Sequence, residues 1–280
     1  LTAADFVLST NGITGALITG ISGSGNTFTI TVQTGTGDGS IQMSLLNDNG
    51  IFPLINNKPF TATGFYTIDK TPPLINSINI PDRTMKINDT IAVTVSVKPD
   101  KDIYKLLSGS INGFIVSSFT KKNDSLYTGS CVVSNGGNDI AAEANIPGSI
   151  ALIDSVGNTA SFQAQIMQTS DPIDANKPFI TVFIIPANAV YKAGDTLDFI
   201  FRFNETIVLT STITASTLSL TIGTKTKSAV YSGGSLTDSL LFRYIIQPGD
   251  SDKDGISTGS SISLNSADIK DIAGNNASLS

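Results

Sequence analysis

Apolar and polar residues alternate with a period of two along several short stretches of the chain. Clear examples are residues 27–32, 91–97 and 197–203, in which every second side chain is apolar. This alternation predicts β-strands that bury one face. Turns rich in Gly, Ser, Asn and Asp separate the stretches, as at residues 23–26. No apolar stripe of period 3.6 occurs, so the sequence predicts an all-β fold built of antiparallel β-sandwiches.

One stretch of the chain occurs twice in the same register. Asp69-Lys-Thr-Pro-Pro73 and the apolar run that ends at Pro81 recur 105 residues later, between Asp174 and Pro186. Each copy leads through a turn into an alternating strand. A recurrence at this period predicts repeated domains of about a hundred residues. We expect three units, namely a first unit at 1–69 that lacks its first strands, a middle unit at 70–173, and a last unit at 174–280 that lacks its last strand.

The two longer units carry further matching features. Both contain a turn of the form Asp-x-x-Gly-Asn, at residues 154–158 and 271–275, where Gly and Asn tolerate a positive φ. In the last unit, residues 218–222 and 228–231 predict a hairpin across residues 224–227. The strands expected in the middle unit lie near 74–80, 91–97, 113–119, 126–133 and 159–167. The apolar side chains expected to enter the core of the last unit are Leu197, Phe199, Phe201 and Phe203.

The composition excludes several classes of function. The net charge is −6, with 23 acidic and 17 basic residues, so the chain offers no basic patch for nucleic acid or an anionic membrane. It contains no His, which removes the usual Ser-His-Asp machinery and imidazole zinc sites. It contains no Trp, which weakens an interpretation as a sugar-stacking module. We therefore expect the chain not to be an enzyme.

The single cysteine, Cys131, lies in an alternating strand, and we expect it to be a small buried apolar residue. With one cysteine, no disulfide can form within the chain. The longest apolar run, residues 179–185, has the length of a strand, far below the ~18 residues of a membrane span. The start of the chain lacks the basic and apolar segments of a signal peptide. These features predict an internal segment of an extracellular protein.

The first unit resembles the bacterial Ig-like domains that are strung together in giant cell-surface adhesins, including those of the gliding type in the Bacteroidetes. The resemblance rests on Leu1-Thr-Ala-Ala-Asp-Phe-Val-Leu8, on residues 18–32, on Gly37-Asp-Gly39 and on residues 66–73. The pattern Phe203-Asn-Glu-Thr-Ile207 is similar to the end of the family's second strand. The resemblance implies tandem Ig-like domains on the bacterial cell surface, where each repeat contacts its neighbours.

A cluster of Asp residues in the last unit is a candidate calcium site. Asp250, Asp252 and Asp254 occupy positions 1, 3 and 5 of a loop, Gly255 allows a sharp turn, and the carbonyl of Ile256 follows. The loop lacks the Glu at position 12 of an EF-hand, which is Ser261 here. If strands alternate in direction, Asp195 lies at the same end and is a possible further ligand. The alternative is a solvated acidic turn.

The linker between the middle and last units is a second candidate. Its residues Asp171 and Asp174 lie where a calcium ion would stiffen a hinge between domains, although Asp also caps turns beside Pro. By the strand count, Glu205 lies at the same end of the last unit. As an isolated carboxylate it is more often a surface residue than a ligand.

Short acidic-hydroxyl motifs also recur. The triplet Asp-Ser/Thr-aliphatic resembles the acceptor pattern for O-glycosylation of exported Bacteroidetes proteins, although Asp-Thr is also common where a turn enters a strand. The five triplets begin at Asp89, Asp124, Asp154, Asp195 and Asp238.

These observations favour a structural stalk segment of a bacterial adhesin, stiffened by calcium and projecting a distal binding region. Two alternatives remain open. One unit could bind a glycan or a protein, or the units could be accessory domains of a secreted enzyme.

Overall fold

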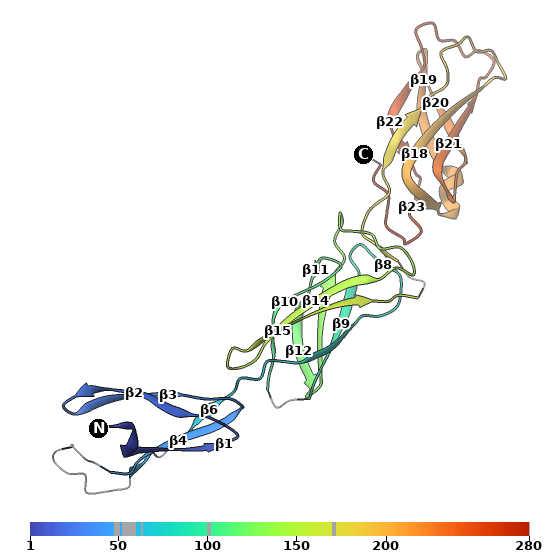
Figure 1. Ribbon diagram of the computed structural model, residues 1–280. Helices are drawn as coiled ribbons and strands as arrows, with labels where there is room; N and C mark the ends of the chain where they lie inside the picture. The colour runs from blue at the N-terminus through green and yellow to red at the C-terminus, as the bar shows by residue number, and fades with distance from the viewer. Residues whose placement is uncertain (48–50, 52–59, 63, 100–101, 170–171, 280) are drawn as a thin grey trace.

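The structure is a computed structural model that describes residues 1–47, 51, 60–62, 64–99, 102–169 and 172–279. Its strands form almost wholly antiparallel sheets, and the described residues contain no α-helix. The chain is therefore an all-β protein of sandwich character. Its sheets form three bodies that follow one another along the chain (Figure 1). No described helix has the length and apolarity that crossing a membrane would require.

The first unit contains two small sheets. In one, β4 pairs with β1, β5 and β6, and in the other β2 and β3 pair with each other and with no further described strand. Tight turns with positive φ close the connections, for example Gly25 between β2 and β3. The bounds are η1 (Ala3–Asp5), β1 (Phe6–Asn11), β2 (Leu17–Ser24), β3 (Thr27–Gln33), β4 (Gly39–Leu45), β5 (Phe60–Thr61) and β6 (Tyr66–Ile68).

The middle unit contains two four-stranded sheets, ordered β11-β10-β14-β15 and β12-β13-β9-β7. Their inward side chains form one buried cluster drawn from residues 75–175, in which Tyr127 is 1% exposed. Cys131 is likewise 1% exposed, which confirms its prediction as a buried residue. The bounds are β7 (Ile75–Asn79), β8 (Met85–Lys86), β9 (Thr90–Val97), β10 (Lys105–Ile111), β11 (Phe114–Ile115), β12 (Ser117–Asn123), β13 (Leu126–Val132), β14 (Ile146–Ile153), β15 (Thr159–Ile166) and β16 (Ile173–Asp174).

The last unit is built around the long strand β18, which pairs with β17, β21 and β23. Its core cluster is separate from that of the middle unit and is drawn from residues 197–269. The predicted inward residues Leu197, Phe199, Phe201 and Phe203 are at most 9% exposed, which confirms them. The bounds are β17 (Ile180–Ile184), β18 (Thr196–Leu209), η2 (Ser211–Ala215), β19 (Thr217–Ile222), β20 (Lys225–Gly233), β21 (Thr237–Ile245), β22 (Ser257–Ser263) and β23 (Ile269–Lys270).

Two local predictions need correction. The stretch 113–119, expected as one strand, breaks at Val116, and β11 and β12 on either side join different sheets. The hairpin of β19 and β20 forms as predicted, but Ile222 pairs with Lys225, so the turn is Gly223-Thr224. Gly223 has φ +55°, which suits a two-residue turn better than the longer loop that was expected.

Candidate metal sites at the junctions

The predicted calcium loop has its carboxylates engaged by protein donors. The Nζ atom of Lys227 lies 2.9 Å from Oδ1 of Asp250, and the hydroxyl of Tyr244 donates to Oδ2 at 2.7 Å. These bonds, that of Lys227 first, lower the pKa of Asp250 to about 2. Asp252 accepts backbone N–H groups from Gly223 at 2.7 Å and Gly255 at 2.9 Å. Lysine thus already supplies the counter-charge that a calcium ion would bring.

The remaining predicted members of this site are Asp195, Asp254 and Ile256, and the N–H of Asp254 donates to Oδ1 of Asp252 at 3.2 Å. Asp195 does lie at the same end, because its carbonyl accepts a bond from the backbone N–H of Ile246 at 2.9 Å. Its carboxylate, however, accepts the N–H of Lys192 at 2.8 Å and so closes its own turn. Asp254 is exposed and Ile256 is half-buried against the core. The calcium assignment of this loop stays a prediction.

Two other groups of carboxylates converge among the described residues. Each consists of three acidic side chains whose ligand oxygens all lie within 4.8 Å of one another. In each group, two members are half-buried and the third is buried. Either group could hold a metal ion. The first group is Asp69, Asp102 and Asp154, and the second is Asp174, Glu205 and Asp271.

Corresponding segments of the repeat supply both groups, although Asp102 and Glu205 do not occupy the same position in the aligned strands. Asp69 and Asp174 are the linker residues that begin the two copies of the repeated stretch. Asp102 follows β9, and Glu205 lies in the second half of β18, just after the alternating stretch that matches β9. The last member comes from the Asp-x-x-Gly-Asn turn. Each group therefore joins a linker to the unit that follows it, at the start of that unit.

The turn aspartates are held in place by backbone donors. Oδ1 of Asp154 accepts the N–H groups of Gly157 at 2.7 Å and Asn158 at 2.8 Å. Oδ1 of Asp271 accepts those of Gly274 at 2.6 Å and Asn275 at 2.8 Å. Both glycines have φ near +100°, a conformation that favours glycine.

The second carboxylate oxygen of the turn aspartate has different hydrogen-bond partners in the two groups. Oδ2 of Asp154 accepts the side-chain amide of Asn158 at 2.8 Å. Asp271 is only 2% exposed, and its buried Oδ2 accepts no hydrogen bond from the residues that the structure describes. Buried polar atoms are nearly always paired, so an unpaired buried oxygen on a member of this carboxylate group suits a cation.

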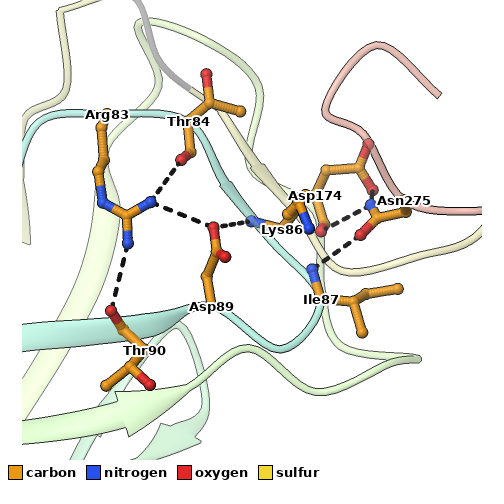
Figure 2. Close-up of polar contacts among 8 residues, drawn as sticks. All are labelled: Arg83, Thr84, Lys86, Ile87, Asp89, Thr90, Asp174 and Asn275. Atoms are coloured by element: carbon orange, nitrogen blue, oxygen red, sulfur yellow. Dashed lines mark hydrogen bonds and ion pairs between the residues drawn. The ribbon is translucent and has the colours of Figure 1, made fainter. Parts of the chain in front are cut away.

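The asparagine of each turn ties the linker to its unit. The amide of Asn158 donates to the carbonyl of Asp69 at 3.3 Å, and that of Asn275 donates to Oδ1 of Asp174 at 3.1 Å. Figure 2 shows that Asn275 also reaches the middle unit, since its Oδ1 accepts the N–H of Ile87 at 2.9 Å. The second junction thus includes a buried bond between consecutive units.

The unit before each linker also binds that linker, through the side chain of an aspartate. Oδ1 of Asp38 in the first unit accepts the N–H of Lys70 at 2.6 Å. Oδ1 of Asp139 in the middle unit accepts the N–H of Ala175 at 2.7 Å, and also the side-chain amide of Asn176 at 2.9 Å. Each linker is therefore held by an aspartate of the preceding unit and by the turn asparagine of the following unit.

The second group carries strong electrostatic repulsion. Burial, followed by the charges of Asp174, Asp271 and Asp139, raises the pKa of Glu205 to about 7. Burial and the charges of Asp271 and Asp139 also raise the pKa of Asp174. At an effective dielectric constant of about 20, two charges about 5 Å apart repel by roughly 3 kcal/mol. A divalent cation would convert this repulsion into attraction.

Of this second group, Asp174 was a candidate ligand, whereas Glu205 was interpreted as more often a surface residue than a ligand. Asp174 and Glu205 were expected at the same end of the last unit, and the structure confirms that they lie together. Asp171 lies outside the described residues. Asp102 was not expected in any site, whereas Asp154 and Asp271 were expected as turn residues, and Asp154 also as the start of an acidic-hydroxyl triplet. The signal that could have found them is that an Asp-x-x-Gly-Asn turn accompanies each linker aspartate.

The candidate glycosylation triplets lie where turns meet strands. Three of the five hydroxyl residues are exposed, and the other two are half-buried. The carboxylate of Asp89 is engaged with Arg83 at 3.2 Å, as Figure 2 shows. Glycosylation at these positions stays a prediction. The exposed residues are Thr90, Ser155 and Thr196, and the half-buried ones are Ser125 and Ser239.

Comparison with known proteins gives only distant structural similarity. No family model and no curated protein matches the chain. Latent, dimeric PorU of Porphyromonas gingivalis aligns at 12% identity with a TM-score of 0.25, over 98% of this chain and 29% of that one. SGBP-B of the mixed-linkage glucan utilization locus of Bacteroides ovatus, solved with a heptasaccharide, aligns at 16% identity and a TM-score of 0.21, over 86% of this chain and 60% of that one.

A third solved structure, the secreted serine protease VesC of Vibrio cholerae, aligns at 11% identity with a TM-score of 0.17, over 89% of this chain and 62% of that one. This chain thus spans less than two thirds of each of the three proteins. At these TM-scores the similarity carries no argument about activity, ligand or partner.

Proposed function

We propose that this chain is a segment of a stalk on a bacterial cell surface, built of tandem Ig-like units whose junctions are stiffened by calcium. The observation that carries the proposal is the repetition of one carboxylate group at both junctions. Each group combines the linker aspartate with two carboxylates of the following unit. Because the site recurs at the junctions between repeated units, it would influence how successive units are oriented along the whole array.

The ligand chemistry favours calcium. Calcium takes six to eight oxygen ligands, mostly carboxylates, carbonyls and water, in flexible geometry. Asp174, Glu205 and Asp271 supply carboxylate oxygens from three separate segments, and the described residues near them offer no His or Cys. Magnesium demands a more regular octahedron and loses its water reluctantly, so it fits such a half-buried group less well.

Stiffening follows from how the linker is held. Without an ion, the second linker depends on hydrogen bonds from Asn275 and on Asp139 in the preceding unit. An ion bound to Asp174 would attach the linker to β18 and to the Asp271 turn as well. Rotation of one unit against the next would then require breaking metal–oxygen bonds. The array would therefore keep its extended length.

Small-angle scattering tests the proposal. We expect the chain to have a larger maximum dimension and a narrower distribution of shapes with calcium than with a chelator. The variant Asp174→Asn, which removes the linker ligand, should lose this difference at the second junction. Asp254→Asn is the matched control, because Asp254 is exposed and its loop follows the end of β21 that pairs with Thr196, whereas Glu205 lies near the other end of β18. Identical scattering in calcium and chelator for the unaltered chain would remove the stiffening role.

A further inference from the structure

The two carboxylate groups at the junctions differ in how completely hydrogen bonds already satisfy their turn aspartates. In the first group, Oδ1 of Asp154 accepts the N–H of Val156 at 3.0 Å as well as those of Gly157 and Asn158. Its Oδ2 accepts the side-chain amide of Asn158 at 2.8 Å. Both oxygens of this buried carboxylate therefore already have donors within their own turn. A cation at this position would have to compete with those donors.

In the second group, the corresponding asparagine is directed toward the linker instead. The side-chain amide of Asn275 donates to Oδ1 of Asp174 at 3.1 Å, as Figure 2 shows. Oδ2 of Asp271 accepts no hydrogen bond from the described residues, although the carbon chain of Lys86 lies beside the same turn. A buried carboxylate oxygen without a donor is costly in the metal-free chain. A cation therefore gains more at this group than at the first.

A lysine also supplies positive charge to the first group. Nζ of Lys121 donates to the carbonyl of Asp102 at 3.0 Å. The corresponding segment of the second group contributes Glu205, whose Oε1 accepts the neutral side-chain amide of Asn204 at 3.1 Å. A neutral donor offsets a negative charge less than an ammonium group does. The second group therefore leaves more charge for a cation to neutralise.

The second linker is more deeply embedded in the protein than the first. Asp174 ends the short strand β16, which pairs with β8, and its neighbours Ile173 and Ala175 are at most 1% exposed. Asp69 lies outside the described strands, and the two residues that follow it are exposed. A ligand that is already fixed loses less conformational entropy when it binds an ion. This difference also favours binding at the second junction.

We propose that the two junctions bind calcium in a fixed order, the group of Asp174, Glu205 and Asp271 filling before the group of Asp69, Asp102 and Asp154. The inference rests on the proposed function and adds to it the order in which the junctions fill. As the calcium concentration rises, the joint between the middle and last units stiffens first. The joint between the first and middle units stiffens only at a higher concentration, so the chain straightens in two steps.

Isothermal titration calorimetry of the metal-free 280-residue chain with calcium tests this order. We expect two binding events, the tighter with a Kd at least about tenfold lower than that of the weaker. Asp174→Asn should remove the tighter event, and Asp69→Asn should remove the weaker one. Because these two aspartates occupy the same position of the repeat, each variant is the matched control of the other.

A lysine variant tests one cause of the difference without altering a ligand. Lys121→Met removes the ammonium group beside Asp102 and should tighten the weaker event by about threefold, while the tighter event stays unchanged. Lys122→Met, at the exposed neighbouring position of β12, makes the same change of charge and should alter neither event. Equal effects of the two variants would overturn the role given to Lys121.

Hydrogen exchange of the unaltered chain covers the case in which a variant fails to fold. The amides of residues 271–275 should become protected at a calcium concentration at least about tenfold lower than the concentration that protects residues 154–158. Protection of both turns together, or in the reverse order, would overturn this inference and leave the proposed function standing. The absence of saturable calcium binding at either junction would overturn both.

Discussion

The substitution Glu205→Gln is expected to have opposite effects on stability in the absence and presence of calcium. In the metal-free chain, Glu205 lies against Asp174 and Asp271, and burial together with these charges raises its pKa from 4.5 to about 7. Glutamine keeps almost the same shape and one oxygen, but removes one negative charge. Without metal, the variant should therefore be more stable than the unaltered protein.

The magnitude follows from the pKa. One pKa unit corresponds to about 1.36 kcal/mol of differential interaction. Glu205 is only half-buried, so solvent screening reduces the effect, and on the order of 1–2 kcal/mol is expected at pH 7.5. For a unit of about a hundred residues, each kcal/mol shifts the melting temperature by roughly 4–8 °C. The gain should therefore be visible as a clear rise in melting temperature in a chelator.

Calcium should reverse the order of stability of the variant and the unaltered protein. A ligand that binds only the folded state at 100 times its Kd adds about 2.7 kcal/mol of stability. The variant retains two of the three carboxylates, so it binds the ion more weakly and gains less. The unaltered protein should then be the more stable of the two in saturating calcium, provided that the metal contribution exceeds the relief of repulsion.

Differential scanning calorimetry in chelator and in calcium measures both effects. Glu143→Gln is the matched control, because Glu143 is the only other glutamate, is exposed and lies outside both carboxylate groups. It should leave both melting temperatures unchanged. A Glu205→Gln variant that is less stable than the unaltered chain in chelator, yet gains as much from calcium, would refute the reasoning about this group.

Three further outcomes are expected. In chelator, the last unit should become more stable as the pH falls from about 7 to about 5, because its folded state binds a proton at Glu205 that the unfolded state releases. Calorimetry across this range checks the sign, and Glu205→Gln should show a weaker pH dependence, to which the raised pKa of Asp174 still contributes. Asp174→Asn should lower the heat of calcium binding, whereas Asp254→Asn should leave it unchanged, as isothermal titration would show. Phe242→Ala should destabilise the last unit by about 3–5 kcal/mol in urea, because Phe242 is 0% exposed.

The alternating strands could be predicted from the sequence because each has one side in the core. In β9 and the first part of β18, apolar residues occupy every second position, and these side chains are the buried ones. The strands β10 and β14 were missed, because they contain residues that usually indicate turns. β14 includes Pro147 and Gly148, and β10 includes Gly109.

The glycines in these strands have a packing reason. A Cβ at Gly109 would lie 2.7 Å from Cδ1 of Ile150, and a Cβ at Gly148 would lie 3.1 Å from Cδ1 of Ile166. Large side chains of neighbouring strands thus occupy the space that a side chain would take. Such complementarity between residues 18 and 41 positions apart leaves no local signal, so a pattern based on sequence neighbours interprets these glycines as turns.

The predicted calcium loop and the carboxylate group at the second junction show more clearly what sequence neighbours cannot predict. Asp250, Asp252 and Asp254 are dense in sequence, yet the fold gives Asp250 a lysine and Asp252 backbone N–H groups. Asp174 and Asp271 are 97 residues apart and gave no local sign of a shared site, yet the sandwich brings them together.

Several carboxylates close together in the sequence therefore predict a cation site poorly. Each of them can instead accept hydrogen bonds from the backbone N–H groups of a turn. Convergence from distant segments is harder to explain by turn chemistry alone. Three separate parts of the backbone must be held against mutual repulsion, and the protein does so at both junctions. At the second junction it also leaves Oδ2 of Asp271 without a donor. A bound cation accounts for both features, which is why the junctions and not the loop carry the proposed function.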